Sequence, residues 1–125
     1  MVYVKNLEKD TVENDFFRKV LNTAPHSQLV VMSLLPGEDI GEEVHEVDQF
    51  IRIEQGQGKA ILDGEEFEIE DDFAVVIPAG TRHNIINSGE NKMKLYTIYT
   101  PPEHAPGTIH KTKAEAMKAE EHYEG

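Results

Sequence analysis

The sequence DDFAVVIPAGTRHNIINSG, residues 71–89, decides the fold. Within it, residues 73–77 form a short apolar run rich in β-branched side chains, which predicts a buried strand. A turn over residues 78–80 ends this strand, and Gly80 allows the backbone to bend there. His83 follows the turn and begins the next strand. The stretch therefore predicts two strands joined by a tight bend, which either directs His83 inward or leaves it as a hydrogen-bonding surface residue.

Short strands separated by turn signals continue through residues 28–99. The turn signals recur at intervals of about 8–12 residues, which is typical of β-sandwiches and β-barrels. The strongest local signal is Asp63-Gly64, which stands between two strand-like runs and predicts a two-residue hairpin turn. The pattern predicts an all-β domain, although periodicity alone does not separate a sandwich from a barrel.

Short helices are expected on either side of the strands. Residues 12–21 place apolar side chains at near-helical spacing, with Asn14 or Asp15 as the N-cap. Near the other end, Thr112 and Glu115 have the spacing of a capping box, which predicts a short polar helix or a frayed tail.

Composition limits the classes of function. The 125 residues fit one domain and include no cysteine, which excludes disulfides, thiolate catalysis and cysteine-ligated metals. The net charge of −12 argues against nucleic acid and against an acidic membrane surface as partners. No apolar run approaches the roughly 20 residues of a membrane span, and the first residues lack the apolar region of a signal peptide. We therefore expect a cytoplasmic protein.

A second stretch, PGEDIGEEVHEVDQFIRIEQGQG over residues 36–58, concentrates polar side chains on one face of a strand. Glu43, His45 and Gln49 share the same strand parity, whereas Asp48 has the opposite parity unless a bulge intervenes. Burying these polar groups without partners would cost several kcal/mol, and a metal ion would satisfy them. The alternative is a solvated acidic edge.

Together the two stretches resemble the two motifs of the cupin family. The first motif has a glycine, five residues, His-x-His, three or four residues, a glutamate, six residues and a glycine. Residues 37–56 are similar to it, with Glu43 in place of the first histidine, His45 as the second and Gln49 in place of the glutamate.

The second cupin motif is matched by residues 72–87. Pro78, Gly80, His83 and Asn87 stand at the family's spacing, and Asp72 replaces the opening glycine. The resemblance implies an all-β fold, a double-stranded β-helix (jelly-roll) barrel with a short N-terminal helix and a short C-terminal helix or tail. It divides one domain into an N-terminal helix and arm (1–27), the cupin barrel (28–100) and a C-terminal loop and tail (101–125).

The resemblance also implies a metal site at Glu43, His45, Gln49 and His83. Two histidines and one carboxylate suit Fe(II), and Mn, Ni, Co or Zn could also bind. Gln49 is a weaker donor than the family's glutamate, so it either ligates the metal or orients a water or a substrate.

Three further residues are expected as acid–base or binding groups, namely Tyr96, Tyr99 and His104. The segment 101–110 is interpreted either as a lid over the barrel mouth or as a surface connection. The expected function is that of a metal-binding cupin that acts on or binds a small polar metabolite, similar to a sugar or a carbonyl acid, in the barrel mouth. The first hypothesis is a metal-dependent enzyme such as an isomerase or a dioxygenase. The alternative is a non-catalytic module that binds a small molecule, with or without metal. A homodimer is expected.

Overall fold

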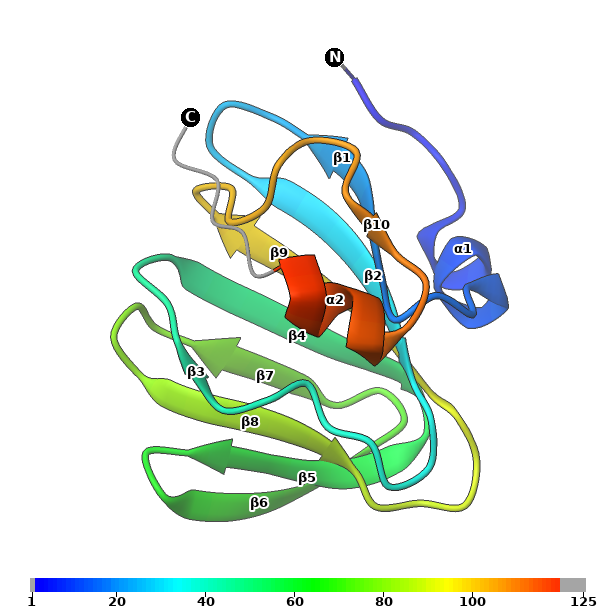
Figure 1. Cartoon of the computed structure of the whole chain (residues 1–125), viewed down its shortest axis with the longest axis vertical. Coiled ribbons are helices and arrows are strands. Elements are labelled where there is room, and N and C mark those ends of the chain that lie inside the picture. Colours follow the sequence, from blue (N-terminus) through cyan, green and yellow to red (C-terminus); the bar gives the residue numbers. More distant parts are fainter. Residues whose placement is uncertain (1, 120–125) are drawn as a thin grey trace.

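The computed structural model describes residues 2–119, which form two antiparallel β-sheets and two short helices (Figure 1). In chain order the elements are α1 (Leu7–Glu13), β1 (Arg18–Thr23), β2 (Gln28–Leu34), β3 (Glu43–Val44), β4 (Asp48–Gln55), β5 (Gln57–Leu62), β6 (Glu65–Glu70), β7 (Ala74–Ile77), β8 (Arg82–Asn87), β9 (Met93–Thr100), β10 (Ile109–His110) and α2 (Lys113–Ala119).

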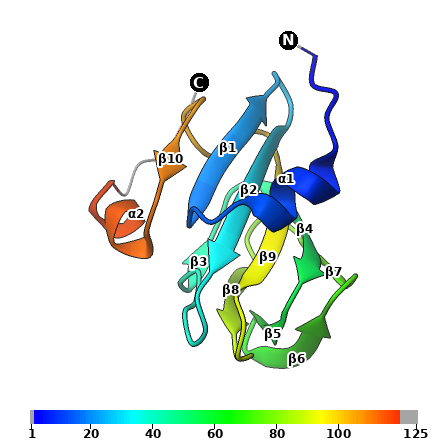
Figure 2. The same ribbon diagram turned by 90° about the vertical axis from the view of Figure 1, so that its right-hand side faces the viewer.

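The two sheets face each other and enclose the core. One sheet has the strand order β10-β1-β2-β9-β4-β7, and the other has the order β3-β8-β5-β6. This arrangement confirms the all-β jelly-roll barrel expected from the sequence. The larger sheet includes β1 and β10, so the strands extend beyond residues 28–100 on both sides, as Figure 2 shows for β10 beside β1.

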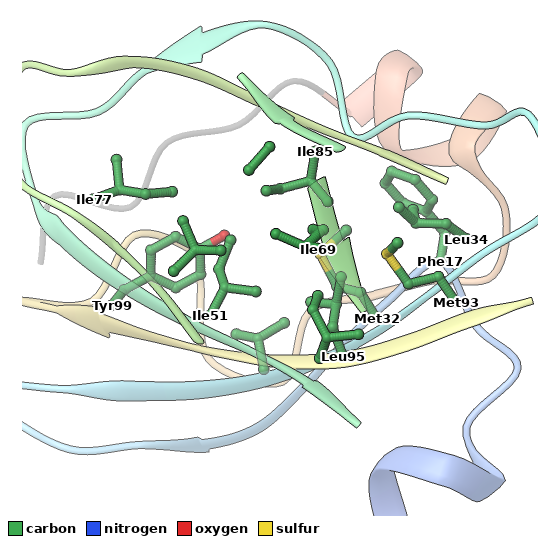
Figure 3. Packing of buried hydrophobic residues seen from close by; sticks show 14 of the residues in the cluster. Phe17, Met32, Leu34, Ile51, Ile69, Ile77, Ile85, Met93, Leu95 and Tyr99 are labelled. Carbon is green, nitrogen blue, oxygen red and sulfur yellow. The ribbon is translucent and has the colours of Figure 1, made fainter. Parts of the chain in front are cut away.

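The core is built from the inward-facing positions of alternating strands. In β4 and in residues 95–100 of β9 the buried side chains alternate with more exposed ones, as a sheet with one covered face requires. Figure 3 shows Tyr99 near Ile51 and Ile77 at one end of the core, with Phe17 and Met93 at the other. Burial of each such side chain contributes roughly 1.5–3 kcal/mol to the free energy of folding.

Two turns follow the predicted chemistry. Asp63 and Gly64 both have positive φ, at 49° and 84°, and they join β5 to β6 with Leu62 opposite Glu65. Positive φ at both central residues is the requirement of the hairpin turn that Asp-Gly favours. Gly80 has φ 87° in the bend before β8, a conformation that a residue with a Cβ adopts only under strain.

The helix expected over residues 12–21 is wrong in position. The N-terminal helix is α1, capped by the Asn6 side chain, which accepts a hydrogen bond from the backbone N–H of Lys9 at 3.1 Å. Asn14 lies at its C-terminal end instead of capping its start. Residues 18–23 form β1, because pairing with β2 and β10 outweighs a weak local helical pattern.

The strand after residue 72 is less buried than expected. β7 is at the edge of the larger sheet, and only its alternate residues face the core. Phe73 is 44% exposed and Val76 is 66% exposed, so the run is a half-buried edge strand. A continuous apolar run does not by itself distinguish these two cases.

The C-terminal helix begins as the capping box predicts. The backbone N–H of Glu115 donates to Thr112 Oγ1, and the Glu115 carboxylate accepts from the backbone N–H of Thr112, both at 3.2 Å. Ala116 packs against the core. The last part of the expected tail, residues 120–125, lies outside the described residues. Within residues 2–119, neither helix has the length or the apolar character needed to cross a lipid bilayer.

Candidate functional site

Strand register brings most of the expected site residues to one end of the barrel interior. In the larger sheet Tyr99 stands between Gln28 and Gln49 in a single cross-strand row. In the smaller sheet Glu43 is directly opposite His83. Buried polar groups from both sheets therefore meet between the layers, next to the apolar core.

His45 is at the centre of this polar cluster. Its Nε2 lies 2.9 Å from Glu43 Oε2, and its Nδ1 lies 3.2 Å from Gln49 Oε1. The ring centroids of His45 and His83 are 4.9 Å apart, and those of His45 and Tyr99 are 5.8 Å apart. The structure thus brings together all four residues expected as metal ligands.

The electrostatics of the Glu43–His45 pair favour charge on both partners. Burial alone would raise the pKa of Glu43, but the hydrogen bond to His45 and the positive charges of His45 and Arg18 lower it. Burial alone would lower the pKa of His45, but the hydrogen bond and charge of Glu43, with the charge of Glu103, raise it. Both partners of His45 are oxygen acceptors, so its two ring nitrogens act as donors to them.

His83 is held differently. Its Nδ1 donates to the backbone carbonyl of Thr81 at 2.8 Å, which leaves Nε2 as the unprotonated nitrogen of the ring. Burial lowers the pKa of His83, and the charge of His45 lowers it further. A neutral imidazole anchored through one nitrogen is the form that binds metals.

The donor chemistry fits a divalent metal ion. Gln49 donates its amide N–H to Thr97 Oγ1 at 3.1 Å, so its oxygen is the atom directed at the cluster. The cluster then offers two imidazoles, one ionised carboxylate and one amide oxygen. Within residues 2–119, no three His, Cys, Asp or Glu side chains are already arranged around a common ion position. Metal uptake would therefore require His45 to lose a proton and to give up a hydrogen bond that it now makes.

A buried glutamine attaches the 101–110 segment to the site. Gln28 is 1% exposed, and its Oε1 accepts from the backbone N–H groups of Glu103 at 3.2 Å and His104 at 2.9 Å. Its Nε2 donates to the carbonyl of His104 at 2.7 Å. Glu103 Oε2 lies 3.9 Å from His45 Nε2. The segment is thus packed into the site, which differs from the surface connection considered as an alternative.

His104 is buried without a hydrogen-bond partner on either ring nitrogen among the described residues. It is 8% exposed, and its ring stands edge-on to Tyr99 at a centroid distance of 5.2 Å. Burial, with a smaller contribution from the charge of Arg18, lowers the pKa of His104 to about 3. Burial likewise raises the pKa of Tyr99. His104 is therefore a neutral donor–acceptor ring at physiological pH.

A cavity of about 460 Å³ adjoins the cluster at the open side of the barrel, between β1, β10, the β2–β3 connection and α2. Glu43, Glu103 and His104 line it and connect it to the buried cluster. Arg18 and His110 also line it and are directly opposite each other in the β1–β10 pair. Three site residues were not predicted from the sequence, namely Arg18, Glu103 and Gln28. Arg18 was missed because the apolar spacing around it predicted a helix.

Comparison with known proteins agrees with the geometry. A family model described as the Cupin domain matches residues 30–99. The chain belongs to the cupin family. A crystal structure of BH2720 from Bacillus halodurans is similar to this cupin with a TM-score of 0.93 and 45% identity, covering 94% of this chain and 95% of its own.

Two relatives by sequence are described only as uncharacterized proteins. YrkC of Bacillus subtilis (strain 168) is 49% identical to this cupin over 126 residues, covering 95% of this chain and 68% of its own. L612 of Acanthamoeba polyphaga mimivirus is 48% identical over 114 residues, covering 86% of this chain and 71% of its own. These similarities establish the family. They do not identify a ligand, which has to be inferred from the residues of the site.

Two residues considered from the sequence lie away from the cluster. Tyr96 is on the opposite face of β9 from Tyr99, where its ring is 6.4 Å from that of Phe50. Strand parity separates the two tyrosines, because residues three apart point to opposite faces. Asp48 is exposed and accepts a hydrogen bond from the backbone N–H of Ala79 at 2.9 Å, so it supports the turn before β8.

Proposed function

We propose that this cupin binds a divalent metal ion at Glu43, His45, Gln49 and His83, and binds a small polar metabolite in the adjoining cavity. The observation that carries the proposal is the grouping of these four donors around His45, with the oxygen of Gln49 and the neutral ring of His83 directed into the cluster. Thr81 and Thr97, which hold His83 and Gln49, act as the outer hydrogen-bond partners that orient metal ligands.

The residues beside the metal ligands support chemistry on a bound small molecule. A bound metal ion would supply Lewis acidity, or a redox centre if the metal is redox-active. Because burial lowers its pKa to about 3, His104 is neutral at physiological pH and can donate one hydrogen bond and accept another without carrying charge. Glu103 places a carboxylate beside His45 and the cavity. These groups suit the binding and proton transfer of a hydroxyl- or carbonyl-bearing metabolite, as an isomerase or dioxygenase requires.

A metal-free binding module is the second candidate. The observation that favours it is the hydrogen bonding of His45 to both Glu43 and Gln49, which satisfies the cluster without an ion. In this case Arg18, Glu103 and His104 would bind the ligand, and no turnover would follow.

Elemental analysis of protein purified without chelators and without a metal-binding tag distinguishes the two candidates. Near-stoichiometric Fe, Mn, Ni, Co or Zn, retained after dialysis, supports the metal site. Protein that remains below a tenth of an equivalent after incubation with each of these ions in turn would contradict it and favour the metal-free module.

We also propose that the protein is a homodimer. The exposed apolar side chains of Phe73 and Val76 lie at and beside the edge strand β7, and a second copy could cover them. Light scattering after size exclusion measures the mass directly, and a mass of 14.1 kDa at all concentrations would contradict the dimer.

A further inference from the structure

A buried arginine lines the cavity beside the proposed metal site. Arg18 is the first residue of β1, is 8% exposed, and stacks its guanidinium 5.2 Å from the ring centroid of Phe17. An arginine is charged at every physiological pH, and placing its charge away from water is costly unless a partner compensates it. The charge of Glu43 compensates part of this cost, so the case for a ligand rests on the hydrogen bonding of the guanidinium.

The hydrogen bonding of Arg18 leaves donor capacity unused. Its Nη1 lies 3.1 Å from Nδ1 of His110. Because a guanidinium can only donate, Nδ1 of His110 is the acceptor in this bond. The Nε–H of Arg18 is buried and has no hydrogen-bond partner among the described residues. Both ring nitrogens of His104, on the same cavity wall, are likewise without one.

The charges around the cavity favour a ligand with a single negative charge. Glu43 and Glu103 also line the wall, and a ligand with two or more negative charges would be repelled by them. Lys113, the other cation of the wall, is paired with Asp39. Arg18 is therefore the group of the described wall that is best placed to bind an anion.

We propose that Arg18 binds the carboxylate of a small monocarboxylic acid, and that His104 contacts a second oxygen of the same molecule. The planar fork of a guanidinium matches a carboxylate with two parallel hydrogen bonds, which a sugar hydroxyl does not reproduce. The cavity of about 460 Å³ has the size of a small-molecule site. This inference deepens the proposed function, because it rests on the same cavity and selects the carbonyl acid over the sugar.

The test compares acids with their uncharged amides. Pyruvate and lactate, with pyruvamide and lactamide as matched controls, are titrated into the full chain and followed by NMR chemical shifts. We expect saturable binding of the acids at least about tenfold tighter than that of the amides, because a charged hydrogen-bonded pair is worth more than a neutral one. Acids and amides that bind alike, or acids that do not bind saturably, would overturn the proposal.

Variants assign the preference to Arg18. Arg18→Gln is expected to bind acids and amides alike, whereas Arg52→Gln, on the outer face of the larger sheet, keeps the wild-type preference. Arg18→Lys retains the charge but lacks the planar guanidinium, and it replaces Arg18→Gln in the test if that variant does not fold. Its preference for acids over amides is expected to be weaker than that of the wild type and stronger than that of Arg18→Gln. A folded Arg18 variant that keeps the full preference would overturn the assignment.

Metal content measured on the same samples keeps this inference separate from the proposed metal site. A preference for acids that is present in metal-free protein and lost in Arg18→Gln supports the role of Arg18 even if no metal binds. Metal binding with no preference for acids overturns the role of Arg18 and leaves the metal site intact.

Discussion

The side-chain amide of Gln28 makes two hydrogen bonds to the backbone of His104, in the pattern that links neighbouring strands of a sheet. The Gln28 amide accepts from the N–H of His104 at 2.9 Å and donates to its carbonyl at 2.7 Å. A buried side chain thus satisfies the backbone of a residue 76 positions away and fixes His104 beside Tyr99.

Replacing Gln28 by methionine should therefore release the segment that carries His104. The variant keeps the shape of the side chain but leaves buried backbone groups of Glu103 and His104 without partners. We expect a loss of about 2–4 kcal/mol in the free energy of unfolding, measured by denaturant titration. Gln55→Met, at an exposed position of β4, is the control and should change stability by less than about 0.5 kcal/mol.

His83→Ala should abolish metal binding and leave the fold intact, because the remaining donors are too few to hold the ion. Metal per protein, measured by elemental analysis, should fall from near one to below about a tenth. His26→Ala, at an exposed position in the β1–β2 turn, should retain the wild-type metal content. Full metal occupancy in His83→Ala would contradict the ligand assignment.

Gln49→Glu should tighten metal binding, because a carboxylate attracts a divalent cation more strongly than a neutral amide does. Competition with a chelator at saturating metal should show an affinity higher by roughly tenfold. Gln55→Glu adds the same charge to an exposed position of the same strand and should change the affinity little. Unchanged or weaker binding in Gln49→Glu would mean that residue 49 orients His45 without ligating the ion.

Burial of neutral His104 should make the protein less stable as the pH falls. Its pKa is lowered from about 6.5 in the unfolded chain to about 3 in the fold, so the unfolded chain binds the proton first. This contribution to stability is fully present above pH 6.5 and is lost as the pH falls toward 3. Relative to His104→Phe, the wild type should lose about 2–3 kcal/mol between pH 7.5 and 4.5.

The measurement is denaturant unfolding across that pH range with a chelator present, so that metal release does not contribute. His26→Phe, which removes an exposed histidine, is the control and should follow the wild type. Parallel curves for the wild type and His104→Phe would show that His104 is not held neutral in the fold.

Local chemistry let the sequence alone predict most of the strands, the turns and most of the polar cluster. The hairpin at Asp63-Gly64 and the bend at Gly80 depend on backbone conformations that few residues adopt, so those residue types predict them directly. Glu43 and His45 share a face because side chains alternate along a strand. The match to the cupin spacing added His83, which β8 places opposite Glu43.

Only the tertiary structure decided what surrounds that cluster. Residues 18–23 became β1 because they pair with β2 and β10, and this pairing turned Arg18 into a wall of the cavity. Gln28 acquired its role from a segment more than 70 residues away. Such roles depend on long-range pairing and on which side chains become buried together, and neither is encoded in the spacing of nearby residues.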